Sequence, residues 1–76
     1  MQSLGQAVYR YICAHSRNGE WGVGKRVIVS EMVLRGYLHP VRDRVNLALQ
    51  DYLQMNKLVL RKGRYIHKRA LEATFS

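Results

Sequence analysis

The segment from residue 40 to 55 constrains the fold more than any other part of the chain, because its apolar residues recur at a helical period. Pro40 fits the first position of a helix, where its missing N–H costs nothing, and Asn56 fits a C-terminal cap. The pattern therefore predicts an amphipathic helix over residues 40–55, with one face against a core. The apolar positions on that face are Val41, Val45, Ala48, Leu49 and Tyr52.

A β-hairpin is predicted directly after this helix. Residues 58–60 and 65–67 are two short β-type runs, and the four residues between them contain Gly63. Short apolar runs on either side of a glycine-containing turn are typical of a hairpin. We expect residues 68–76 to add one or two helical turns or to fray.

The first predicted helix covers residues 4–17. Ser3 and Gln6 fit a capping box, in which the serine accepts from the first turn and the glutamine reaches back. Asn18 and Gly19 tolerate the left-handed backbone that often ends a helix. The residues at helical spacing are Leu4, Val8, Tyr11, Ile12 and His15.

Between residues 18 and 36 the sequence predicts a loop, a strand and a short helix. Three glycines surround Trp21, which we expect to anchor the loop over the core; base stacking is the alternative role. Residues 26–29 are apolar and β-branched and predict a brief strand. Ser30 then fits the cap of a second helix over residues 31–35, which Gly36 closes.

The charge balance points to a polyanionic partner. Thirteen Lys and Arg oppose five Asp and Glu, which gives a formal net charge of +8 over 76 residues. Such like charge repels itself in the folded state and is usually tolerated because a polyanion binds. The alternative is a basic protein without an anionic ligand. Because 47% of the residues are hydrophobic, a globular core is expected rather than disorder.

The basic residues concentrate on the predicted hairpin. Six of them lie between residues 57 and 69, where there is no acid, and Gly63 lets the turn approach a ligand closely. Such a cluster suits contacts with phosphates. An edge hairpin also uses charge to block aggregation, but one or two charges suffice for that. The cluster comprises Lys57, Arg61, Lys62, Arg64, Lys68 and Arg69.

The outward face of the helix over residues 40–55 carries side chains that read base edges. Arg pairs with guanine, Asn and Gln pair with adenine, an acid accepts from cytosine, and an apolar side chain meets the thymine methyl. The alternative is an ordinary polar surface, which explains the leading Arg-x-Arg-x-Asn less well. The predicted base-reading residues are Arg42, Asp43, Arg44, Asn46, Leu47 and Gln50. Further candidates for backbone contacts are Lys25, Arg26, Arg35, Tyr37 and His39.

The order of the predicted elements is helix, short strand, short helix, turn, long helix and hairpin. Residues 30–65 read SEMVLRG-YLH-PVRDRVNLALQDYLQMNKLVL-RKG-RY. With a glycine after the short helix and a basic hairpin after the long one, residues 4–67 resemble the winged helix-turn-helix family. The resemblance implies an α+β winged helix-turn-helix fold: three helices, a short strand and a C-terminal β-hairpin wing. We expect one domain over residues 1–76. Its small size is similar to that of stand-alone regulators encoded by archaeal viruses and plasmids.

The resemblance also implies a function. In that family the long helix enters the major groove and the wing lies on the backbone or in the minor groove. We therefore expect a sequence-specific regulator of transcription that binds double-stranded DNA. The alternatives are a winged-helix module for RNA or the ribosome, and one that binds an acidic protein. A monomer in solution is expected, with pairing on DNA left open, and exposure of Leu47 or Phe75 would count against it.

Other classes of function find little support in the residues. Cys13, the one cysteine, allows no disulfide within the chain and is expected to be a small buried side chain. His15 and His67 lack partners at metal-ligand spacing, so no metal or other cofactor is expected. The chain lacks an evident catalytic constellation and is predicted not to be an enzyme. Without a signal peptide or a long apolar run, we expect a cytoplasmic protein with no membrane segment.

Overall fold

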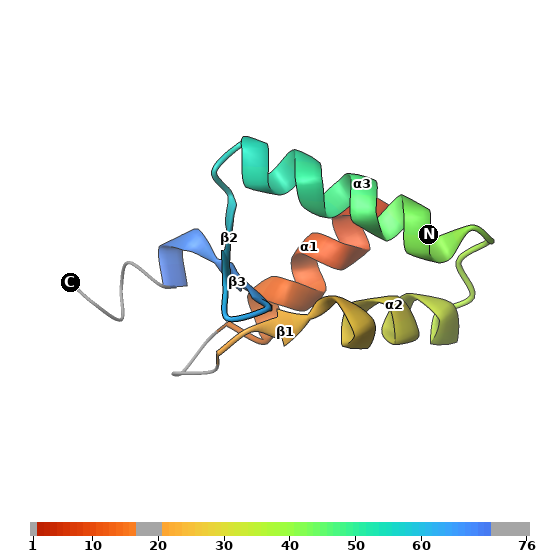
Figure 1. Ribbon diagram of the computed structural model, residues 1–76. Coiled ribbons are helices and arrows are strands. Elements are labelled where there is room, and N and C mark those ends of the chain that lie inside the picture. Colours follow the sequence, from red (N-terminus) through yellow and green to blue (C-terminus); the bar gives the residue numbers. More distant parts are fainter. Residues whose placement is uncertain (1, 17–20, 71–76) are drawn as a thin grey trace.

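The computed structural model describes residues 2–16 and 21–70, and over these residues the chain is a small α+β fold (Figure 1). Residues 68–70 are also helical. In chain order, the helices and strands are α1 (Leu4–Ala14), β1 (Val23–Gly24), α2 (Lys25–Leu34), α3 (Val41–Gln54), β2 (Leu58–Arg61) and β3 (Arg64–His67).

The three strands form an antiparallel sheet in the order β1-β3-β2. Val23 of β1 and Leu60 of β2 both pair with Tyr65 of β3. The turn between β2 and β3 is Lys62–Gly63, with φ of 51° and 77°. Two successive residues with positive φ match the right-handed twist of the flanking strands, which is why short hairpins favour this turn. The predicted hairpin is confirmed, and its strands extend one residue further into the turn on each side.

The core lies where the three helices meet the inner face of the sheet. Figure 1 shows α1 between α3 and α2, and Leu58 and Tyr65 close the core from the sheet. The apolar faces predicted for residues 4–17 and 40–55 supply much of it, so both predictions are confirmed in their essentials. The largest fully buried side chains are Val8, Ile12, Ile28, Met32, Val45 and Leu49.

The strand predicted over residues 26–29 is wrong, because these residues belong to α2. Ile28 and Met32 lie one helical turn apart and are both completely buried. Burial of that face outweighs the modest β-preference of the branched residues. The strand that pairs with β3 is Val23–Gly24 instead, and Gly24 takes the N-cap position predicted for Ser30.

The end of α2 is as predicted. Gly36 has a φ of 87°, and the N–H of Tyr37 donates to the carbonyl of Met32 at 3.2 Å. This is the glycine-terminated closure that satisfies the last carbonyls of a helix. The chain then turns through residues 37–40 into α3.

The other boundaries differ from prediction by a few residues. Ser3 accepts from the N–H of Gln6 at 3.3 Å, as predicted, but α1 ends at Ala14 rather than at 17. Pro40 is the N-cap of α3 rather than its first residue, and Asn56 follows the helix with a φ of 58°. The predicted stop at residues 18–19, and residues 71–76 with Phe75, lie outside the described residues.

Candidate nucleic-acid interface

The outward face of α3 presents a row of side chains on one flank and Arg44 on the other. Successive helical residues are rotated by about 100°, so residues four apart form one row. Arg42, Asn46 and Gln50 make up one row, in which Asn46 is half-buried and the other two are exposed. Arg44 lies about 200° around the helix from Arg42. Asp43 and Leu47 are exposed between this row and Arg44, and Asp43 lies in the first turn, where the helix dipole favours an acid.

The Arg42 row lies beside the start of α2. Arg42 lines a hollow of about 210 Å³ together with Lys25, Arg26, Val29 and Ser30. Three positive side chains from two helices therefore surround one space. From the sequence, Lys25 and Arg26 are only secondary candidates for backbone contacts, at the junction of a predicted loop and a predicted strand. The true position of α2 brings them next to α3.

The tip of the hairpin also lies beside the start of α2. Gly24, the N-cap of α2, pairs with Arg64, and a side chain on Gly24 would begin 3.6 Å from the carbonyl oxygen of Gly63. The Arg64 guanidinium reaches across β1 and donates from Nη1 to the carbonyl of Gly22 at 3.3 Å. The start of α3, the start of α2 and the hairpin tip are thus contiguous.

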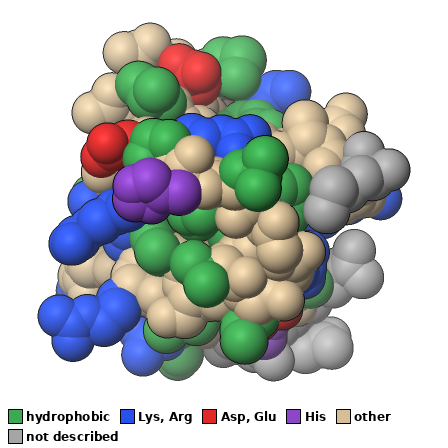
Figure 2. Space-filling view, turned by 90° about the vertical axis from the view of Figure 1, so that its right-hand side faces the viewer, with side chains coloured by type: hydrophobic (Ala, Val, Ile, Leu, Met, Phe, Trp, Pro, Cys, Tyr) green, Lys and Arg blue, Asp and Glu red, His purple; other side chains and the backbone are tan. Residues whose placement is uncertain are grey.

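We call this surface the basic face and define it by Lys25, Arg26, Arg42, Lys62 and Arg64. Figure 2, which looks onto the end of the molecule opposite the hairpin, shows Lys and Arg side chains along the left-hand edge of the view. Lys25 is half-buried and the other four residues are exposed. The arrangement can contact a polyanion along its length from three separate elements.

The first turn of α2 lacks the capping side chain and the acid that usually stabilise the N-terminus of a helix. Among the described residues no side chain caps this helix at Gly24, and its first turn has two cations and no acid. The helix dipole disfavours positive charge at this end. An anion beside Lys25 and Arg26 would relieve that repulsion and accept from the free N–H groups.

Three predicted contact residues have partners inside the fold. Arg35 pairs with Glu31 at 3.3 Å and lies 5.5 Å from the centre of the Tyr11 ring. The Tyr37 hydroxyl donates to the carbonyl of Gln2 at 2.8 Å, and Arg44 Nη1 donates to that of Leu38 at 3.1 Å. These contacts hold the α2–α3 connection against the helices. His39 is exposed in the same connection.

The basic cluster of residues 57–69 divides into two groups. Arg61, Lys62 and Arg64 line one hollow at the hairpin tip. Lys57, Lys68 and Arg69 line another of about 390 Å³ at the hairpin base. From the sequence, all six residues form a single cluster, because spacing along the chain does not reveal which end of a hairpin a residue occupies.

The hairpin base is organised around Tyr9. Lys57 Nζ lies 5.9 Å from the centre of the Tyr9 ring, whose hydroxyl is 2.9 Å from His67 Nε2. Burial raises the pKa of Tyr9 above its ordinary value. The hydroxyl therefore stays protonated near neutral pH. The contacts of Tyr9 with Lys57 and His67 pack the hairpin against α1. Cys13, expected from the sequence to be buried, is half-buried, and so is His15.

Several apolar side chains remain exposed at the opposite end of α2 from the basic face. Leu34 and Leu38 are 81% and 77% exposed, and Figure 2 shows hydrophobic side chains spread over this end of the molecule. Leu47 is 63% exposed, which counts against the expected monomer. The oligomeric state stays a prediction.

Comparison with known proteins gives no match: no family model, curated protein or solved structure matches the chain. Within residues 2–16 and 21–70, no three or more His, Cys, Asp and Glu side chains form a group that could hold a metal ion. None of the helices in these ranges is long and apolar enough to cross a membrane.

Proposed function

We propose that the protein is a sequence-specific, double-stranded DNA-binding regulator of transcription with a winged helix-turn-helix fold. In this proposal α3 enters the major groove and the hairpin tip holds the backbone or the minor groove. The observation that supports it best is the basic face, which joins the leading end of α3 to the hairpin tip through the start of α2.

The proposed fold agrees with the order of the elements. A short strand precedes α2, a glycine-closed turn connects α2 to the long helix α3, and a hairpin follows. Regulation of transcription is the part of the proposal that comes from the resemblance to the family. In the proposal, regulation follows from binding to a specific DNA sequence.

The two kinds of contact divide between the elements. The exposed Arg42 and Gln50, with Asn46 between them, project the donors and acceptors that pair with guanine and adenine in the major groove. Lys25 and Arg26 at the start of α2, and the hairpin tip, supply sequence-independent contacts with phosphates. A helix flanked by phosphate contacts on one side is thereby fixed in register along the groove.

The proposal predicts that the hairpin tip contributes strongly to the salt dependence of binding. Replacing Lys62 and Arg64 together with glutamine should weaken binding to all duplexes and flatten the plot of log affinity against log salt. The expected loss of slope is about 0.9 for each phosphate contact, or roughly 1.8 in total. Fluorescence anisotropy of a labelled duplex at several salt concentrations measures this slope.

A matched variant removes the same charge from the hairpin base, by replacing Lys57 and Arg69 with glutamine. Because these residues lie beside Tyr9, away from the start of α2, the slope should fall less. Thermal denaturation checks that both variants are folded. An unchanged slope in the tip variant, or a larger loss in the base variant, would remove the tip from the proposed interface.

A further inference from the structure

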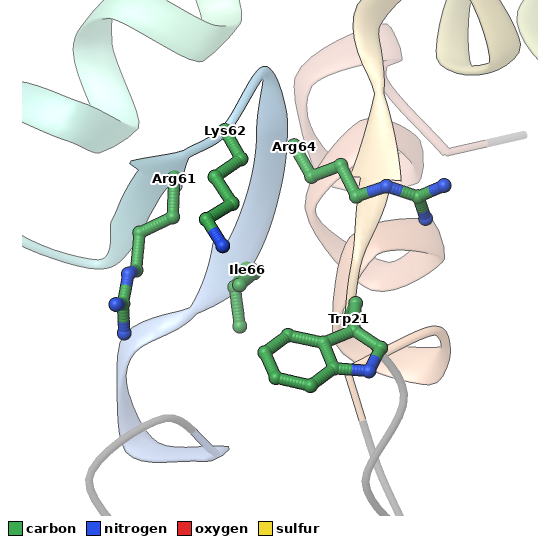
Figure 3. Close-up of a pocket in the computed structure, with 5 residues that line it drawn as sticks. All are labelled: Trp21, Arg61, Lys62, Arg64 and Ile66. Atoms are coloured by element: carbon green, nitrogen blue, oxygen red, sulfur yellow. The ribbon is translucent and has the colours of Figure 1, made fainter.

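The outward side of the sheet carries a hollow that shares the hairpin tip with the proposed duplex interface and adds Trp21 and Ile66 to it. Its volume is about 430 Å³, and it is lined by Trp21, Ile66 and the three cations of the hairpin tip (Figure 3). Trp21 is 67% exposed, so the expectation that it packs over the core is wrong. A large apolar ring is therefore held in water beside positive charge.

The sheet itself builds this hollow. Tyr65 packs into the core, so its neighbour Ile66 faces the other side, and alternation places Arg64 on the same side as Ile66. Trp21 joins them because Gly22 approaches β3 closely: a side chain on Gly22 would overlap the carbonyl oxygen of Tyr65 and begin 2.8 Å from Ile66 Cγ1. The indole consequently lies at the edge of the sheet beside Ile66.

Lys62 and Arg64 line the hollow together with the ring, but their side chains run in different directions, and Figure 3 shows Arg64 extending across β1, away from Lys62. Figure 3 shows the Lys62 ammonium pointing toward the space above Ile66, with the indole of Trp21 on the other side of that space. Arg64 is held by its bond to the Gly22 carbonyl, which uses one of its five N–H donors and leaves others for a ligand. The hollow thus combines a flat aromatic wall, an apolar floor and a cationic rim.

We propose that this hollow binds an unpaired nucleotide within a single strand of nucleic acid. The base stacks on Trp21 over Ile66, and the adjoining phosphate contacts Lys62 and Arg64. A phosphate alone would leave the exposed indole unused, and an apolar ligand would leave the cations unused. Stacking platforms bordered by positive charge are how single strands are bound without sequence preference.

This activity goes beyond the proposed recognition of duplex DNA. Paired bases are stacked within the helix and present only their edges, so they cannot lie on the indole. The hairpin tip borders both surfaces, whereas Trp21 and Ile66 belong only to the hollow. Changes at Trp21 therefore separate the two activities.

The test uses the fluorescence of Trp21, the sole tryptophan of the chain. The full chain is titrated with a thymidine oligonucleotide, with an abasic strand of equal length and charge, and with thymidine monophosphate. We expect the oligonucleotide to quench the fluorescence at a much lower concentration than the other two. Equal quenching by the abasic strand would exclude stacking, and equal affinity for the mononucleotide would exclude a strand as the ligand.

Variants at Trp21 then test the contribution of the ring. Anisotropy with a labelled oligonucleotide should show affinity falling about 5- to 150-fold for Trp21→Ala, with most of it retained for Trp21→Phe. Duplex binding should be the same in both variants, so failure here is distinguishable from failure of the proposed function. Unchanged strand affinity in Trp21→Ala would overturn the proposal. So would a fluorescence change on raising the protein concentration alone, because a second copy would then cover the hollow.

Discussion

Replacing Gly22 with alanine should lower the free energy of unfolding by roughly 3 kcal/mol or more, a large share of the stability of a small domain. Gly22 has a φ of 81° and is buried against β3, where an added side chain would overlap the carbonyl oxygen of Tyr65. Neither the left-handed backbone nor the close approach can be kept without strain. Chemical denaturation followed by circular dichroism measures the loss.

Gly36→Ala is the matched control for this prediction. Gly36 has a similar φ of 87°, but among the described residues, apart from Gly36 and its chain neighbours, no atom lies within 4 Å of the position that its Cβ would take. Its replacement should therefore cost only the backbone strain, about 1–2 kcal/mol. The difference between the two variants isolates the close approach of Gly22 to β3. Equal losses would show that Gly22 does not need to lie against the hairpin.

Replacing Arg42 with alanine should lower the affinity for a preferred duplex sequence about 5- to 150-fold, which corresponds to the roughly 1–3 kcal/mol of a specific base contact. Arg42 is exposed at the leading end of α3 and borders the hollow shared with Lys25 and Arg26. Affinity for random duplex should fall much less, because the phosphate contacts from α2 and the hairpin remain. Competition titrations with both duplexes give the specificity ratio.

Arg44→Ala removes the same charge two residues along the helix. Arg44 lies on the far flank of α3 and donates to the Leu38 carbonyl, so its loss should change the specificity ratio less than that of Arg42. From the sequence, either arginine is an equal candidate for reading bases. A larger loss of specificity in Arg44→Ala would mean that the opposite flank of α3 faces the DNA.

Local signals in the sequence were sufficient to predict α3 and the hairpin. The apolar period after Pro40 extends over several turns, and Gly63 between two β-type runs is typical of a hairpin turn. The start of α2 could not be predicted in this way, because residues 26–29 satisfy the preferences of a strand. The burial of Ile28 and Met32 against the other helices decides the outcome, and that is a tertiary effect.

The candidate site was predictable in its parts but not in its assembly. The charge of the hairpin and the polar face of α3 follow from composition and period. The alignment of Lys25 and Arg26 with Arg42 depends on α2 and on the pairing of Gly24 with Arg64, which residue spacing does not encode. The exposure of Trp21 likewise depends on the contact of Gly22 with β3.

Selection from a pool of random duplexes tests the central claim most directly. The unmodified chain is incubated with the pool at near-physiological salt, and the bound sequences are amplified and read over successive rounds, beside a parallel pool of random RNA. Sequence-specific binding through α3 predicts an enriched duplex motif whose enrichment weakens in the Arg42→Ala variant. Absence of any enriched duplex motif, or enrichment from the RNA pool alone, would contradict the account.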